Sequence, residues 1–328
     1  MPSVKVSERS DSAERAQLRR RVLAAGGQAK RRWRTSASNR PTWMILPGAI
    51  ALIVLIVIPT LITIAMSLLN VNVGTLDHWV TAPFAGLSNF RTALGNSGLF
   101  GVTAARSILI SVLFSILTTV VIVPLGVLAA LSVNRKFRGQ AVVRGIYLLP
   151  YVIPVYVVAI FARIVFLNQY GIVDKILGSN TYWLVGPNAF WAMLLTEIWS
   201  TWPFIYLMTL AGLQSIPREH YEAAAVDGAG GMWKLRKIVL PQLWGVLGIA
   251  ILMSTLFHFG NFTLAFVMFS SPPPPSVAVL PIATYFTAFS TFDYGVASAI
   301  SVVTMAILII PAYLYIKVTR AARIREVM

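Results

Sequence analysis

One carboxylate lies within a long apolar stretch of this sequence, and it is the first position where chemistry could occur. Glu197 lies in TEIWSTWPF, beside Trp199, Trp202 and Phe204. An ionisable side chain inside a membrane span is costly and is by default a candidate functional site. Aromatic faces suit the C–H faces of sugar rings, and carboxylates bind their hydroxyls. The alternatives are a polar contact between helices and a protonated carboxyl against lipid.

A second group of polar and aromatic side chains lies in STLFHFGNF. Ser254, Phe257, His258 and Asn261 recur at i, i+3, i+4 and i+7, which is the spacing of one stripe of an α-helix. We expect these residues to share a helix face, which makes this stretch a second candidate ligand site. A packing contact between helices remains the alternative for each residue.

Several kinds of chemistry are excluded by the residues that the sequence lacks. It contains no cysteine, which excludes disulfides, thiolate metal sites and thiol catalysis. Its three histidines, at positions 78, 220 and 258, are too scattered for a metal site. No G-x-x-x-x-G-K-[ST] loop occurs, so the chain cannot cradle ATP phosphates in the usual way. We expect no catalytic residues, metal or cofactor in this chain.

The composition places the chain in a membrane. Of 328 residues, 57% are hydrophobic and 12% charged, whereas soluble domains have about 25% charged residues. Too little polar surface remains to cover a globule, so lipid must cover part of it. The net charge of +16 could suggest nucleic acid. The Lys and Arg residues, however, lie in short segments beside apolar runs, so we expect membrane lipids and no nucleic acid as partners.

Six apolar runs predict an all-α integral membrane protein with six transmembrane helices. A span needs about 20 apolar residues. No Lys, Arg, Asp or Glu occurs between Ile238 and Phe292, and SSPPPPS at 270–276 divides that stretch because consecutive prolines cannot continue a helix. The six expected spans are Met44 to Leu69, Ser107 to Val133, Gly145 to Ala162, Phe190 to Leu213, about Leu243 to Phe269, and Tyr294 to Ile316.

Basic residues set the expected orientation. Most Lys and Arg lie before residue 43, at 134–144, at 234–237 and at 317–325. The positive-inside rule therefore places both termini in the cytoplasm. We expect a basic, disordered or headgroup-bound cytoplasmic arm at 1–42 without a cleaved signal peptide. After the arm we expect a six-helix domain at 43–318, which contains a cytoplasmic loop at 214–242. A cytoplasmic tail at 319–328 ends the chain.

The cytoplasmic loop has the signals of a short helix. Ser215 is a candidate N-cap, Pro217 suits the first turn, and Glu219 favours the helix start. Gly228 can adopt the left-handed conformation that ends a helix. The loop is longer than the two to eight residues that usually connect helices. A small helix with an alanine face and one exposed Glu suits docking into a groove of another protein; the alternative is a simple connection.

The loop carries a family signature. EAAAVDGA at 222–229, followed by IVLP at 238–241, resembles the EAA signature of membrane subunits of binding-protein-dependent ABC importers. Stretches at 84–94, 131–154, 211–224 and 292–303 resemble the carbohydrate branch, in particular the maltose-permease-type first subunit. The likeness covers about residues 43–317. Departures are Leu235, where the family usually carries Phe, the lack of a further proline near Gly245, and SSPPPP in place of a TGGGP-like turn.

The resemblance implies a type I ABC importer permease core in the bacterial plasma (inner) membrane, which transports and is not an enzyme. It implies a second permease subunit, an ABC ATPase dimer that binds ATP and Mg, an extracytoplasmic sugar-binding protein and a sugar substrate as partners. The implied ATPase-coupling residues are Glu222, Ala223, Ala224, Asp227 and Gly228. The implied substrate-binding residues are Glu197, Ser200, Thr201, Phe204, Phe257, His258 and Asn261.

The solute and the transport class have alternatives. The family example carries amides where Glu197 and His258 stand, so a cationic or amino-substituted sugar is our hypothesis. A polyol or a glycerol phosphate ester is the runner-up, although an ester would favour basic groups deep in the spans. A secondary transporter would need paired intramembrane carboxylates or broken helices in inverted repeats, and Glu197 is the single acidic residue within the expected spans.

Overall fold

The computed structural model describes residues 45–95, 103–269 and 272–327, and their regular structure is helical throughout. This confirms the all-α prediction for that part of the chain. The predicted arm at 1–42 lies outside the described residues. The chain divides into two compact units, one ending at Leu61 and the other beginning at Ile62. The first contains α2 (Leu46–Leu52), the π-helical turn η2 (Ile53–Val57) and the start of α3 (Ile58–Ser67).

Four helical stretches among the described residues are long and apolar enough to cross a membrane. A bent pair raises the number to five. The described residues therefore support four or five of the six predicted spans. The fourth predicted span corresponds to α9 (Asn188–Ser215), which is long enough at 28 residues but carries Glu197 and several hydroxyl and amide groups. The four stretches are Leu46–Ser67, Ala104–Ser132, Gly231–Phe259 and Tyr294–Thr319.

The third predicted span is not one helix, which corrects the expectation of a continuous run. It forms α6 (Gln140–Val152) and α7 (Val155–Val165), which meet at 88°. Pro154 explains the break because the residue before a proline avoids the α-helical region. Ile153 is accordingly extended, at φ −72° and ψ 127°.

The fifth predicted span also ends earlier than expected. α12 (Leu240–Phe259) stops at Gly260, and the short helix α13 (Thr263–Met268) follows. Asn261 lies in the turn between them, and its side-chain oxygen accepts a hydrogen bond from Leu264 N at 3.1 Å. An amide side chain that accepts from the first turn is a typical N-terminal cap. The last helix, α15 (Tyr294–Val327), is longer than predicted and continues through the expected tail.

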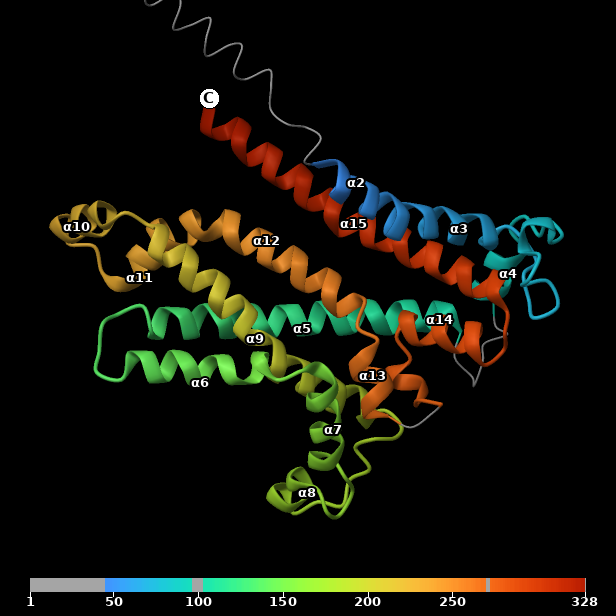
Figure 1. Ribbon diagram of the computed structural model, residues 1–328. Coiled ribbons are helices and arrows are strands. Elements are labelled where there is room, and N and C mark those ends of the chain that lie inside the picture. The colour runs from blue at the N-terminus through green and yellow to red at the C-terminus, as the bar shows by residue number, and fades with distance from the viewer. Residues whose placement is uncertain (1–44, 96–102, 270–271, 328) are drawn as a thin grey trace, which may run out of the picture. The chain divides into compact units, whose positions relative to one another are not determined.

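Small residues let α5 (Ala104–Ser132) serve as the centre of the second unit. A Cβ at Gly126 would lie 2.6 Å from Ile205 Cβ on α9, so only glycine permits this approach. Ser115 Oγ donates to Thr255 O of α12 at 2.7 Å. Figure 1 shows α5, α6, α9 and α12 side by side. The shorter elements are η3 (Trp79–Thr81), α4 (Ser88–Leu94), α8 (Ile172–Leu177), α10 (Arg218–Val226), α11 (Gly231–Lys234), η4 (Leu235–Val239), η5 (Pro275–Val277) and α14 (Leu280–Phe289).

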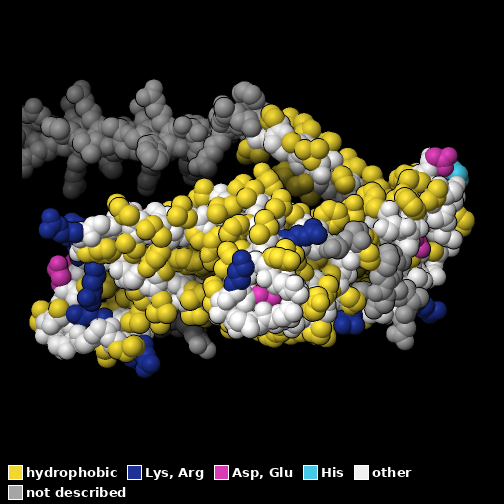
Figure 2. All heavy atoms as spheres, turned by 90° about the horizontal axis from the view of Figure 1, so that it is seen from below, with side chains coloured by type: hydrophobic (Ala, Val, Ile, Leu, Met, Phe, Trp, Pro, Cys, Tyr) yellow, Lys and Arg dark blue, Asp and Glu magenta, His cyan; other side chains and the backbone are white. Residues whose placement is uncertain are grey.

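The surface of these helices is apolar, as a lipid environment requires. Leu109, Val120 and Leu128 of α5 are each more than half exposed. Figure 2 shows a face on which hydrophobic side chains predominate and charged side chains form a few separate groups. A soluble protein rarely exposes so extensive an apolar surface.

Candidate functional site

A buried polar cluster joins α9 to the end of α12. His258 Nδ1 lies 2.8 Å from Glu197 Oε1, and Asn261 Nδ2 donates to Glu197 Oε2 at 2.8 Å. Glu197 is 4% exposed and His258 is 3% exposed. Both carboxylate oxygens are therefore engaged, so Glu197 is in an interhelical contact and not simply against lipid. The structure brings these three residues together although 61 residues of sequence separate Glu197 from His258.

One atom of this cluster lacks a partner. His258 Nε2 is buried and makes no hydrogen bond to any described residue. Nε2 accepts a hydrogen bond when the ring carries its proton on Nδ1, and it donates one when both ring nitrogens carry protons. A hydroxyl suits either form because it can both donate and accept.

Two predicted hydroxyls lie next to the cluster but bond elsewhere. Thr201 Oγ1 donates to the Glu197 backbone oxygen at 2.7 Å, and Ser200 Oγ donates to the same oxygen at 3.2 Å. Both hydroxyls are thus satisfied within their own helix, as is common for Ser and Thr in membrane helices. Ser200 is buried and Thr201 half-buried.

The predicted stripe of α12 is corrected at one position, because the helix ends at Phe259 and does not include Asn261. Ser254 and His258 are buried, whereas Phe257 is 68% exposed, and Asn261 follows the end of the helix. The i, i+3, i+4 spacing allowed a common face, but α12 buries only one edge of that stripe. Phe257 is exposed at the surface of this subunit.

An aromatic neighbour of the predicted residues could not be found from spacing. Phe204 is half-buried, and its ring centroid lies 6.2 Å from that of Tyr151, with the ring planes 32° apart. Tyr151 is 46% exposed, near the end of α6. The two residues are on different helices, so no periodicity in the sequence connects them.

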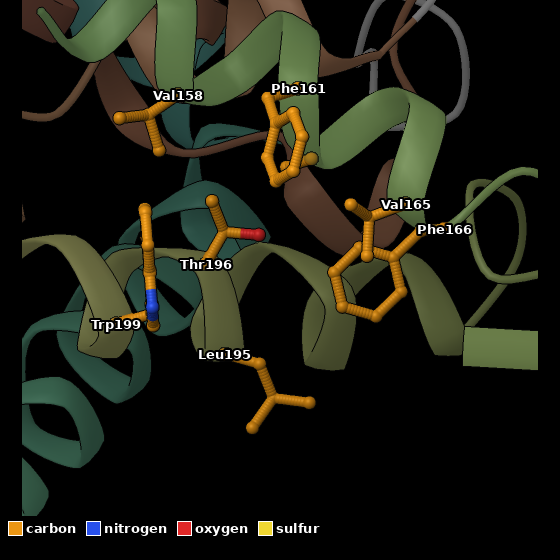
Figure 3. Close-up of a pocket in the computed structure, with 8 residues that line it drawn as sticks. Val158, Phe161, Val165, Phe166, Leu195, Thr196 and Trp199 are labelled. Atoms are coloured by element: carbon orange, nitrogen blue, oxygen red, sulfur yellow. The ribbon is translucent and has the colours of Figure 1, made fainter. Parts of the chain in front are cut away.

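A pocket of about 270 Å³ lies between α7 and α9. Its lining residues Thr196 and Trp199 are neighbours of Glu197 in the sequence. Figure 3 shows Thr196 and Trp199 of α9 facing Val158 and Phe161 of α7. Its lining is almost wholly apolar, and Thr196 Oγ1 already donates to Ala192 O at 2.7 Å. This pocket suits alkyl groups and offers little to a polyhydroxylated ligand.

The loop at 214–242 forms the short helix that was expected, with one difference at its start. Ser215 does not cap α10: its hydroxyl donates to Gly212 O at 2.8 Å, and Pro217 occupies the N-cap position. The serine belongs to the end of α9, and Ile216 and Pro217 are extended, so α10 begins only at Arg218.

The end of α10 is a glycine cap, and this confirms the left-handed conformation predicted for Gly228. Gly228 has φ +71°, and its N–H donates to Ala225 O at 3.1 Å. The N–H of Ala229 donates to Ala224 O at 2.9 Å. This pair of hydrogen bonds is the Schellman arrangement. A Cβ at Gly228 would meet nothing within 4 Å, so its backbone conformation alone favours glycine.

The two faces of α10 differ. Ala224 is 4% exposed, whereas Val226 is 89% exposed and Glu222 and Ala223 are also exposed. The chain returns through α11 and the π-helical turn η4 into α12. Glu222 and Val226 therefore form a surface that another protein could bind, while Ala224 faces this subunit.

Asp174 is a buried carboxylate that the sequence analysis did not single out. It lies in the segment between α7 and α9 and accepts hydrogen bonds from Gln169 N at 3.0 Å, Ser179 Oγ at 2.9 Å and Trp183 Nε1 at 2.8 Å. Burial by itself would raise its pKa, but the hydrogen bonds from Gln169, Trp183, Ser179 and Thr181 outweigh burial and lower the pKa. The Asp174 carboxylate thus stabilises this segment by binding several of its hydrogen-bond donors.

Comparisons with known proteins agree on the family. The family described as binding-protein-dependent transport system inner membrane component matches residues 122–323. The trehalose/maltose transport system permease protein MalF of Thermococcus litoralis is 31% identical over 285 residues, which cover 85% of this chain and 93% of that protein. The sulfoquinovosyl glycerol transport system permease protein SmoG of Agrobacterium fabrum is 31% identical over 286 residues, with 84% and 89% covered.

A solved structure shares the fold. It is the crystal structure of a bacterial alginate ABC transporter in complex with an alginate pentasaccharide-bound periplasmic protein. One of its chains has a TM-score of 0.72 and 20% identity, and the match covers 89% of this chain and 96% of that chain. Together with the family match over 122–323, these relatives show that the chain belongs to the binding-protein-dependent transport system inner membrane components.

Proposed function

We propose that this chain is a transmembrane permease subunit of an ATP-driven ABC importer of sugars in a bacterial inner membrane. The observation that carries the proposal is the 31% identity to a trehalose/maltose permease protein across 85% of the chain. The exposed α10 helix with its glycine cap supports it, because such a helix can be bound by a separate ATPase. Hydrolysis of ATP takes place in that partner and not in this chain.

The complex that we propose has four kinds of component. This chain pairs with a second permease, and the two bind an ABC ATPase dimer on the cytoplasmic side and a sugar-binding protein on the other. Six spans and cytoplasmic termini are part of this proposal. The 1–42 arm and the 319–328 tail then lie in the cytoplasm, and the 43–318 domain carries the coupling loop at 214–242.

Coupling in this proposal works through α10. The outward residues Glu222 and Ala223 contact the ATPase, while Ala224, Asp227 and Gly228 keep the helix and its cap in shape. When ATP closes the ATPase dimer, α10 moves as a rigid body and shifts the spans attached to it. The path then opens outward to receive sugar, and hydrolysis resets it.

The substrate site in this proposal is built on α9 and α12. The exposed ring of Phe257 and the half-buried ring of Phe204 offer aromatic faces, with Ser200 and Thr201 nearby. Glu197 orients His258 and Asn261, and the unpartnered His258 Nε2 offers a polar contact to a ligand hydroxyl. Sugars are rich in hydroxyls, which both donate and accept hydrogen bonds.

The test is a transport assay of the reconstituted complex with its binding protein. We expect sugar-loaded binding protein to stimulate ATP hydrolysis and sugar uptake into proteoliposomes. The ligand panel should include maltose, trehalose, glucosamine, glycerol and glycerol phosphate. Stimulation by glycerol or glycerol phosphate alone would support the runner-up solute. Uptake driven by an ion gradient without ATP would contradict the proposal.

A further inference from the structure

The inward face of α10 is attached to the spans by a side chain that the signature does not include. Tyr221 precedes Glu222 and is half-buried. It packs against an apolar cluster, which we call the inner cluster. The buried members of the inner cluster are Ile122, Ala130, Val133, Ile205, Tyr206, Leu210, Leu213, Ile216, Val239, Leu243, Leu247 and Ala250.

The inner cluster joins the ends of several helices. Leu213 comes from α9, Val239 from η4 and Leu243 from α12. The same two long helices, α9 and α12, carry Glu197 and His258. A displacement of Tyr221 therefore acts on both halves of the polar cluster through packed side chains, because densely packed interiors transmit strain.

The Tyr221 hydroxyl is not what holds the ring in place. Its oxygen is buried and has no hydrogen-bond partner among the described residues. Burial also raises the pKa of the Tyr221 hydroxyl, so the group stays neutral. The ring itself, by its apolar contact, makes the attachment.

The other contact of α10 with α12 is weaker. His220 Nδ1 lies 3.4 Å from Gln242 Nε2, and this pair is exposed. Hydrogen bonds at that distance are long. Ala224 is buried but has little side-chain volume to grip a neighbour. Tyr221 is thus the one large side chain on the inward face of the described helix.

We propose that the Tyr221 ring is a positioning residue that transmits the movement of α10 to α9 and α12. This inference rests on the proposed function, since it assumes that an ATPase moves α10. Glu222 and Tyr221 then have opposite tasks on adjacent positions: the carboxylate faces the ATPase, and the ring faces the spans. Loss of the ring leaves α10 able to bind the ATPase but unable to shift the helices.

The experiment measures the ratio of ATP hydrolysed to sugar imported, in proteoliposomes that contain the complete complex and the loaded binding protein. Tyr221→Ala is expected to raise this ratio by about tenfold or more, as a large apolar contact is lost. Tyr221→Phe is expected to restore the wild-type ratio because the hydroxyl has no partner. In both variants the ATPase should still copurify with the permease.

A further variant, Glu222→Lys, separates the possible failures. Glu222→Lys is expected to weaken copurification of the ATPase, which a change at Tyr221 should not do. A wild-type ratio in Tyr221→Ala, with Glu222→Lys defective, would overturn the role of the ring and leave the proposed function intact. A wild-type ratio in both variants would overturn the coupling assignment of α10 itself.

Tyr221→Leu covers the case in which the alanine variant does not assemble. Leucine keeps part of the apolar contact, so an intermediate ratio supports the inference. A wild-type ratio in the Tyr221→Leu complex, or a Tyr221→Phe complex as defective as the leucine variant, would contradict it.

Discussion

The polar cluster at Glu197 and the proposed coupling loop at α10 reach their shapes by different routes. The loop is local: its cap joins Gly228 to Ala225 and Ala229 to Ala224. The contacts of the polar cluster are long-range in sequence, because Glu197 contacts residues 61 and 64 positions further along the chain. A local motif depends on backbone preference, whereas the cluster depends on how α9 and α12 pack. The comparison predicts that each region fails in its own way.

Among changes at the glycine cap, the largest loss of coupling is expected from breaking the backbone preference of the loop. Gly228→Val places a β-branched residue at φ +71°, and the left-handed conformation costs L-residues about 1–2 kcal/mol or more. The capped loop should then be populated several-fold less, and uptake should fall while ATP hydrolysis continues. The ratio of ATP hydrolysed to sugar imported checks this.

Gly228→Asn is the matched control for that prediction. Asparagine tolerates the left-handed conformation, and a Cβ at this position meets nothing within 4 Å. We therefore expect most of the transport to remain. Equal defects in the valine and asparagine variants would show that something other than backbone conformation limits this position.

The second effect is on the stability of the cluster. Glu197→Ala leaves Asn261 Nδ2 and His258 Nδ1 without their acceptor in a buried site, and a buried polar group left unsatisfied costs about 1–3 kcal/mol. Glu197→Gln keeps an acceptor for one partner, so it should lose less. Thermal unfolding of the purified complex gives the order wild type, glutamine, alanine.

Substrate preference sharpens the same comparison. If Glu197 orients His258 toward a ligand, Glu197→Gln should alter the relative uptake of glucosamine and maltose. Unaltered transport and preference in that variant would remove Glu197 from the proposed substrate site and leave it as a contact between helices.

A third, smaller effect concerns Asp174, a buried carboxylate held locally like the loop. Its pKa is lowered in the folded protein, so its contribution to stability is complete above the ordinary pKa of 3.8. That contribution is lost as the pH falls through the folded-state pKa, because the unfolded state then binds more protons. Asp174→Asn should remove this acid-dependent step in the fluorescence of Trp183, measured against a Trp183→Phe reference.

The smallest effect is expected at Ser215. Its hydroxyl bonds to Gly212 O within α9 and does not cap α10. Ser215→Ala should change stability by less than about 0.5 kcal/mol, as exposed substitutions usually do. A loss of about 1 kcal/mol, which is typical of a removed N-cap, would show that Ser215 caps the helix after all.

Prediction from sequence succeeded for the glycine cap and for the ends of α9, although the local N-cap prediction for Ser215 was wrong. Gly228 was placed in the left-handed region because glycine ends helices there, and the α9 boundaries at Asn188 and Ser215 lie within two residues of the expected Phe190 and Leu213. It failed where a single turn residue decided the path. Pro154 bent the third run by 88°, and Gly260 stopped α12 at Phe259, ten residues before the expected end at Phe269.

The candidate site shows the same division. Helical spacing correctly gathered Ser254 and His258 on one buried edge, but it also included Phe257, which is exposed. Nothing in the spacing indicated that Asn261 would leave the helix and reach Glu197, or that Tyr151 would lie beside Phe204. These pairs come from different helices, so no periodicity within one helix contains them.

By itself, the sequence determined that this chain is a membrane protein and that its regular structure is helical. It also determined that a glycine-capped helix bearing Glu222 interrupts its apolar runs. Composition, helical periodicity and backbone preference act over a few residues, so they can be read directly. Only the tertiary structure decided that Glu197 meets His258 and Asn261, and that the Tyr221 ring faces the inner cluster. Those contacts depend on the angles at which separate helices cross, and the packing of the whole bundle sets these angles.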